Sequence, residues 1–264
     1  MHIFRADPTN AGDWWSPPFR YFPFKPGKVF DILSWKDIPD IEEACIVGGG
    51  GLGREFFAQA LASIQKIPRK GKLIAWGVGA DILENRSGLV ENPKTNLLGD
   101  YFRGFDKLGS RVWESNKAIH WVPCASCMHP NFFHFRNQPI KKRIGIYQHK
   151  RVPIVLRNQG DSSFPVLDNS GDNIDEKLEF LSQFEYVITN TYHGVYWATL
   201  LNRKVICIPF KSGLYSFKHA PAYMKMDLNG EILESAVTYP NALEECRLAN
   251  IAFYNDVVSE YGDI

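Results

Sequence analysis

The same pattern of apolar and polar positions recurs along the chain. A short apolar run passes into glycine or small polar residues, and a longer stretch with apolar residues at helical spacing follows. Residues 44–48 run into the glycines at 48–51, and a helical pattern covers 54–64. A second apolar run, 186–189, ends in Thr-Asn-Thr and continues as a helical pattern to 201. Short apolar runs with helix-length spacers are typical of parallel strands joined by crossover helices. The pattern predicts an α/β fold.

The remaining runs extend this pattern through the whole chain. Further strands are predicted at 2–6, 72–79, 109–112, 118–123, 143–150 and 204–210, with a loop at 161–170. Helices are predicted at 175–184, capped by Asn173 or Asp175, and from Asn241 to 260. A polar stretch near 136–142 divides the series in two. We therefore predict an N-terminal lobe, 1–138, and a C-terminal lobe, 139–264, with the last helix packing back on the first lobe.

Composition and charge narrow the class of protein. Hydrophobic residues make up 45% of 264 residues, which is typical of a globular chain. Thirty basic and 29 acidic residues leave a net charge of +1. The chain as a whole therefore has no strong positive electrostatic potential that would attract nucleic acid. The N-terminus lacks a signal-peptide pattern, and no apolar run reaches the roughly 20 residues that span a bilayer. We predict a cytoplasmic protein with at most a peripheral contact to the inner face of the cytoplasmic membrane, and five reduced cysteines.

His193 is the first candidate for chemistry. It lies where the 186–189 strand passes into a helix, and ligands of open parallel sheets bind at such carboxyl ends. An imidazole there is a candidate acid or base near neutral pH. The alternative is a histidine that caps the helix or packs against the strand end.

The glycine-rich turns and the first polar loop are candidates for ligand contact. Gly50, Gly51 and Gly79 follow predicted strands and would let the backbone approach a phosphate or a substrate closely. A tight strand–helix turn explains them equally. The glycines match neither the dinucleotide-binding pattern nor the P-loop. Asn10 and Asp13 can hydrogen-bond a sugar, or they can close Asx-turns.

Two further segments carry reactive or charged side chains. Cys124 and Cys127 precede His129 and His134, but the histidines crowd one short segment, so buried or cleft-lining thiols are favoured over zinc or a redox dithiol. Lysines stand among Ser and Gly over 211–219, just beyond a predicted strand. Such a loop suits a phosphate or carboxylate, or it is a solvated basic loop.

Together these segments resemble the polysaccharide pyruvyl transferase family. The matching residues, in the family's order, are Asn10-x-Gly12-Asp13, Val47-Gly48-Gly49-Gly50-Gly51, Trp76-Gly77-Val78-Gly79, Ser110-Arg111, Pro123-Cys124-x-Ser126-Cys127 and Asn190-Thr191-Tyr192-His193-Gly194. They span roughly residues 7–220. The family pattern often has Arg where this chain has Thr191, so another cation would have to make that contact.

The resemblance implies a fold and a reaction. The fold is two Rossmann-like lobes with parallel sheets, GT-B-like, with the active site in the cleft between them. The reaction moves a pyruvyl group from phosphoenolpyruvate, a co-substrate, onto a diol of a saccharide or lipid-linked saccharide. The product is a cyclic ketal, and no cofactor or metal is expected.

The resemblance also assigns roles to the candidate residues. His193 is the expected general acid and base. The expected donor-binding residues are Arg111, Lys211, Lys218, Thr191, Gly194, Arg143 and His149. The expected acceptor-binding residues are Asn10, Asp13, Gly50, Gly51 and Gly79. Two alternatives stay open: a GT-B-type glycosyltransferase that uses a nucleotide sugar, and a catalytically inactive saccharide-binding relative.

Overall fold

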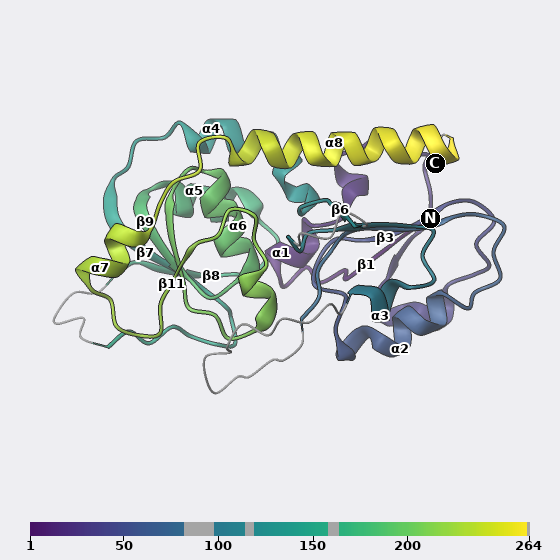
Figure 1. Cartoon of the computed structure of the whole chain (residues 1–264), viewed down its shortest axis with the longest axis horizontal. Coiled ribbons are helices and arrows are strands. Elements are labelled where there is room, and N and C mark those ends of the chain that lie inside the picture. The colour runs from purple at the N-terminus through teal and green to yellow at the C-terminus, as the bar shows by residue number, and fades with distance from the viewer. Residues whose placement is uncertain (82–97, 114–118, 158–163, 263–264) are drawn as a thin grey trace.

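The computed structural model describes residues 1–81, 98–113, 119–157 and 164–262. Its strands form two separate sheets, and every pairing within them is parallel. The first sheet has the order β2-β1-β3-β4-β5-β6 and the second β11-β10-β9-β7-β8. Figure 1 shows them as two lobes side by side. This confirms the predicted α/β class with two Rossmann-like lobes and parallel sheets.

The first lobe is built on a nearly continuous apolar sheet. Its strands are β1 (His2–Phe4), β2 (Val29–Asp31), β3 (Cys45–Gly48), β4 (Leu73–Val78), β5 (Lys107–Ser110) and β6 (His120–Trp121). All residues of β3 and β4 are buried, as expected for central parallel strands covered on both faces. The helices are α1 (Ala11–Trp14), α2 (Glu55–Ile64) and α3 (Leu98–Phe102), with 3₁₀ turns η1 (Pro18–Arg20) and η2 (Ile32–Asp37).

The second lobe follows a connection through η3 (Ala125–Met128) and α4 (Phe132–Arg136). Its strands are β7 (Lys142–Gln148), β8 (Val166–Asp168), β9 (Phe184–Thr189), β10 (Lys204–Cys207) and β11 (Ala222–Tyr223). Its helices are α5 (Ile174–Ser182), α6 (Tyr192–Leu200) and α7 (Gly230–Ser235), with η4 at Ser212–Tyr215. Every residue of α6 is buried, so this helix lies in the core of the lobe.

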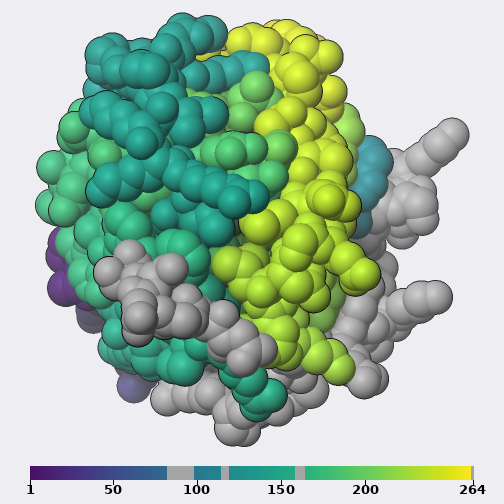
Figure 2. All heavy atoms as spheres, turned by 90° about the vertical axis from the view of Figure 1, so that its left-hand side faces the viewer, coloured from purple at the N-terminus to yellow at the C-terminus, as the bar shows by residue number. Residues whose placement is uncertain are grey.

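The C-terminal helix α8 (Ala242–Tyr261) runs along both lobes (Figure 1). Its first turns pack into the core around α6 through Leu243 and Cys246. Its later turns pack Phe253 and Val257 into the cluster around Trp76 in the first lobe. Figure 2 looks at the outer end of the second lobe, where the teal chain around α4 lies beside the yellow C-terminal chain. The predicted boundary at 138/139 stays a prediction.

Three short strands escaped the sequence pattern. β2, β8 and β11 each have two or three residues, and each is the outermost strand of its sheet. The prediction that 161–170 is a loop was therefore wrong for Val166–Asp168, while 161–163 lie outside the described residues. Edge strands this short have one half-exposed face, so no apolar run or alternation marks them.

Of the two predicted asparagine caps, one makes the expected side-chain hydrogen bond and one does not. Asn173 accepts a hydrogen bond from the backbone N–H of Glu176, which makes it the cap of α5. Asn241 precedes α8 but makes no such side-chain bond. In the described ranges, we find no helix long and apolar enough to cross a membrane.

Candidate active site

His193 is the second residue of α6, directly beyond the carboxyl end of β9. Thr191 is the helix cap, and its hydroxyl accepts a hydrogen bond of 2.8 Å from the backbone N–H of Gly194. A Cβ on Gly194 would lie 2.1 Å from Oγ1 of Thr189, so only glycine fits this turn. Thr191 and Gly194, both predicted to bind the donor, thus shape the strand–helix turn that holds His193.

The imidazole of His193 is enclosed by both lobes. Its Nε2 lies 3.4 Å from Sγ of Cys124, and a Cβ on Gly12 would lie 2.1 Å from its Nδ1. The side chain is buried, and its ring centroid lies 4.9 Å from that of Trp197. Burial, with added repulsion from Arg111 and Lys211, holds the pKa of His193 well below its ordinary value. The imidazole is therefore neutral at pH 7 in the free protein.

Two of the predicted cations, Arg111 and Lys211, act electrostatically on this imidazole. Arg111 follows β5 in the first lobe, is buried, and lies with Cζ 3.6 Å from the ring centroid of Tyr192. Lys211 follows β10 in the second lobe and pairs with Asp81 at 3.1 Å. Both act electrostatically on His193 from opposite lobes. The carboxyl ends of the two sheets therefore meet around one imidazole and two cations.

The glycine turns pack against Arg111. A Cβ on Gly79 would lie 2.3 Å from Nε of Arg111, and one on Gly51 would lie 3.1 Å from its Nη2. Gly79 also donates its backbone N–H to the carbonyl of Gly50 at 2.9 Å. Gly50 has φ +87°, the left-handed region that favours glycine. Of the three glycines predicted on the acceptor side, Gly51 and Gly79 thus pack directly against Arg111, and Gly50 is hydrogen-bonded to Gly79.

The short helix α1 and its cap Asn10 bridge the lobes, and α1 carries the carboxyl group of Asp13. Asn10 donates from Nδ2 to Asp13 at 2.8 Å, and its Oδ1 accepts from Asn169 of the second lobe at 3.0 Å. Burial raises the pKa of Asp13, although Arg111 and Lys211 act in the opposite direction. Gly12, which lies between Asn10 and Asp13 in the chain, packs against the imidazole of His193.

Asp81 is a site residue that the sequence analysis missed. Its carboxylate binds Lys211 and accepts the backbone N–H of Gly213 at 2.9 Å. Burial alone would raise its pKa, but Lys211 and Arg111 outweigh burial and hold the pKa below its usual value. The sequence feature that could have pointed to Asp81 is its position shortly after a predicted strand, β4, where the strands of the first sheet have their carboxyl ends.

Cys124 was recognised only as a buried or cleft-lining thiol. Its contact with His193 gives it a specific neighbour 69 positions away. All five cysteines are free thiols, which agrees with the prediction of reduced cysteines. The imidazole of His129 packs edge-on against Trp15, at 5.2 Å between ring centroids.

The remaining predicted cations lie elsewhere. Arg143 is exposed near the amino end of β7, whereas His193 follows the carboxyl end of the neighbouring β9. Because β7 and β9 are parallel, Arg143 lies at the amino ends of the strands and His193 lies at their carboxyl ends. His149 follows β7, and its backbone N–H donates to Oδ1 of Asn190 at 2.8 Å. His149 therefore lies at the carboxyl ends of the strands, as His193 does, and β7 pairs directly with the strand β9 that leads into α6.

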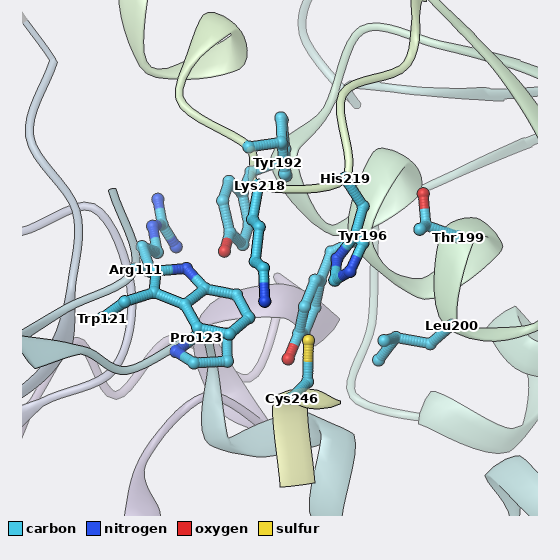
Figure 3. A pocket seen from close by; sticks show the side chains of 11 residues that line it. Arg111, Trp121, Pro123, Tyr192, Tyr196, Thr199, Leu200, Lys218, His219 and Cys246 are labelled. Atoms are coloured by element: carbon cyan, nitrogen blue, oxygen red, sulfur yellow. The ribbon is translucent and has the colours of Figure 1, made fainter. Parts of the chain in front are cut away.

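Lys218 belongs to a small aromatic pocket beside the imidazole site (Figure 3). Its ammonium pairs with Glu245 of α8 at 2.7 Å and lies 4.6 Å from the ring centroid of Trp121. The pocket has a volume of about 20 Å³, room for about one water. Arg111 and Tyr192 line it as well, so Arg111 connects this pocket with the site at His193.

No protein-family model and no curated protein matches this chain. Among solved structures it is similar to an uncharacterised protein of Klebsiella pneumoniae, with 17% identity and a TM-score of 0.42 over 87% of this chain and 93% of that one. It is also similar to the wall teichoic acid polymerase TagF, with 11% identity and a TM-score of 0.35 over 87% of this chain and 73% of the polymerase. Both are distant likenesses, so an activity has to be argued from the site itself.

Proposed function

We propose that this protein is a saccharide-modifying transferase that moves a pyruvyl group from phosphoenolpyruvate onto a sugar diol. The observation that carries the proposal is the buried imidazole of His193 at the strand–helix turn, on which Arg111 of the first lobe and Lys211 of the second both act electrostatically. This arrangement provides one proton-transfer group beside a site for a small anion. The resemblance of the sequence motifs to pyruvyl transferases supplies the reaction.

Arg111 and Lys211 are the proposed anion clamp. The donor carries a phosphate and a carboxylate on three carbons, so it needs at least two cations at short range. Lys211 is paired with Asp81 in the free protein, and the donor would compete with that carboxylate for the ammonium. These two cations take the place of the arginine that the family pattern has at Thr191. His149 is a further candidate on the same edge of the sheet, and Lys218 lies one pocket away.

The proposed reaction balances with His193 as both acid and base. The imidazolium gives its proton to the methylene carbon of the donor, which becomes a methyl group and leaves an oxocarbenium-like centre at the neighbouring carbon. One sugar hydroxyl attacks this centre and passes its proton to His193. The second hydroxyl then displaces phosphate, which leaves with the second hydroxyl's proton. The products are a cyclic pyruvate ketal and hydrogen phosphate. The positive charges of Arg111 and Lys211 stabilise the leaving phosphate, so we propose no cofactor.

The acceptor is proposed to enter from the first lobe. Asn10 and Asp13 offer an amide and a carboxyl group to sugar hydroxyls, and Gly51 and Gly79 let their turns pack closely against Arg111 at the same end of the sheet. We propose a saccharide acceptor, free or attached to a lipid. A lipid-linked acceptor would bring the protein to the inner membrane face through its substrate.

Phosphate release tests this function. Wild-type protein should release phosphate from phosphoenolpyruvate only when a suitable saccharide is present, with the ketal detected by mass spectrometry. His193→Gln should lower the rate by at least about 100-fold, because general acid–base catalysis contributes about that much. His120→Gln is the matched control, since His120 is half exposed on β6.

Three outcomes would contradict the proposal. Unchanged activity in His193→Gln would remove His193 from the chemistry. Saturable binding of a nucleotide diphosphate, without phosphate release from phosphoenolpyruvate, would favour the glycosyltransferase alternative. Binding of a saccharide with neither donor would favour an inactive relative.

A further inference from the structure

Asp81 is held in the way that a bound anion would be held. Its Oδ2 accepts a hydrogen bond of 3.1 Å from Nζ of Lys211, and its Oδ1 accepts one of 2.9 Å from the backbone N–H of Gly213. Each carboxylate oxygen thus accepts from a different group of the second lobe. Although burial alone would raise its pKa, Lys211 and Arg111 keep that pKa below the usual value. Asp81 is therefore a buried carboxylate ion held by charge-assisted hydrogen bonds.

These contacts hold the segment 211–217 against the first lobe. Asp81 follows β4, and a Cβ on Gly213 would lie 2.0 Å from its Oδ1, so the two chains meet at close range. In the same segment, the carbonyl of Ser216 accepts a hydrogen bond of 2.9 Å from the backbone N–H of Trp113. Trp113 follows β5. The segment is therefore tied to the chain beyond two neighbouring strands of the first sheet.

Around the described residues of the site, little space is left for the donor. The imidazole of His193 is buried. The pocket that Arg111 lines holds about one water, and phosphoenolpyruvate is many times larger. The ammonium of Lys211 is already paired with Asp81. For an anion to make full contact with Lys211, Asp81 has to leave it.

We propose that Asp81 is an intramolecular competitor of the donor's carboxylate. In the free protein it holds the segment 211–217 on the first lobe, and the carboxylate of the bound donor takes its place on Lys211 and Gly213. The proposal rests on the proposed function for the identity of the anion. One carboxylate replaces another, so the ammonium and the backbone N–H keep a negative partner throughout. No covalent bond changes in this step.

An intramolecular competitor lowers the affinity for the donor. The apparent dissociation constant of a ligand rises as the form of the protein that can bind it becomes rarer. While Asp81 is paired with Lys211, the free protein is in the form that does not bind the donor. Removing the charge of Asp81 should therefore tighten the binding of the donor, although the removed group lies in the site itself.

Calorimetric titration with phosphoenolpyruvate, at constant pH and ionic strength, tests this competition. Asp81→Asn keeps an oxygen that can accept the N–H of Gly213 and removes the charge that competes at Lys211. Its dissociation constant for the donor should be at least about tenfold lower than that of wild type. The matched control is Asp256→Asn, which breaks an exposed pair with Lys107 at 2.7 Å and should change the constant by less than about twofold.

A double-mutant cycle separates competition at Lys211 from a general effect of charge. Lys211→Met should weaken donor binding, and Asp81→Asn should then add less than about twofold in affinity, because no ammonium is left to compete for. An equal gain in both backgrounds would overturn the proposal. Pyruvate, which has the donor's carboxylate without the phosphate, should also bind Asp81→Asn more tightly than wild type. A gain with inorganic phosphate and none with pyruvate would overturn the assignment to the carboxylate.

A crystal structure of the wild-type protein with phosphoenolpyruvate tests the exchange directly. The ligand's carboxylate should lie on Lys211 and Gly213, with Asp81 moved away from both. Bound donor with the pair of Asp81 and Lys211 intact would overturn the proposal. Thermal unfolding shows whether each variant is folded, and if Asp81→Asn is not, the wild-type complex decides the question.

The failure of this proposal can be told from failure of the proposed function. If Asp81→Asn binds phosphoenolpyruvate more tightly but no saccharide leads to phosphate release in wild-type protein, Asp81 is the competitor and the proposed reaction fails. If phosphate is released and Asp81→Asn gains no affinity, the reaction stands and the role of Asp81 fails.

Discussion

At the scale of single residues, the site depends on what burial does to charge. His193, Asp13 and Asp81 are all drawn away from their usual pKa values, and in different directions. Burial dominates for His193 and Asp13 and favours their neutral forms. Asp81 keeps its charge because Lys211 and Arg111 lie beside it. Neutral and charged groups thus coexist within one small site, as proton transfer beside an anion requires.

Donor binding should therefore be coupled to proton uptake. His193 is neutral at pH 7 because its pKa lies well below the ordinary value, and the donor's negative charge would raise that pKa. We expect the uptake of up to about one proton when phosphoenolpyruvate binds. Calorimetric titrations in buffers with different ionisation enthalpies measure it. The uptake should vanish in His193→Gln and persist in Asp13→Asn. Binding without uptake in wild-type protein would contradict this.

At the scale of elements, the strand–helix turn from β9 to α6 fixes the imidazole. Thr191 caps the helix, and Gly194 leaves space for the hydroxyl of Thr189 and the ring of Tyr147. This turn is local in sequence, so its glycine and its cap were visible in the chain. The partners of the imidazole come from other elements.

Gly194→Ala should destabilise the protein. A Cβ there would lie 2.1 Å from Thr189 Oγ1 and 2.7 Å from Cδ1 of Tyr147, and the surroundings are buried. We expect a loss of about 1–3 kcal/mol in the free energy of unfolding, measured by urea denaturation. Gly230→Ala in α7 is the control, because a Cβ there meets nothing within 4 Å. The idea fails if both variants are equally stable.

At the scale of the whole molecule, α8 ties the lobes together. Oδ1 of Asn250 accepts from Nε1 of Trp76 at 2.9 Å, and its Nδ2 donates to the carbonyl of Pro123 at 3.1 Å. All three groups belong to the contact between the last helix and the first lobe. Because α8 begins in the core of the second lobe, this contact makes the two lobes one unit.

Asn250→Ala should loosen that unit. It leaves the buried indole N–H of Trp76 without its acceptor, which costs about 1–3 kcal/mol. Scanning calorimetry should show one transition for wild-type protein and a lower, broader or split transition for the variant. Ile251→Ala on the same helix is the control, since Ile251 is exposed. Identical transitions for Asn250→Ala and wild type would show that the helix does not couple the lobes.

The amino-acid sequence by itself determined the repeating strand–helix order, the parallel α/β class and the place of His193 after a strand. These features are local: each depends on a run of apolar residues and the glycine or threonine that follows it. The same locality explains the errors, since the edge strands β2 and β8 are too short to make a pattern.

Only the tertiary structure decided which groups share the site. Lys211 meets Asp81 across 130 residues, and His193 meets Cys124 across 69. Arg143 and Arg111 look alike in the sequence, yet Arg143 lies near the amino end of β7, whereas Arg111 packs against Tyr192 and acts electrostatically on His193. Spacing along a chain records which end of a strand a residue follows. It does not record which strands of two separate sheets end face to face, because that depends on how the lobes pack.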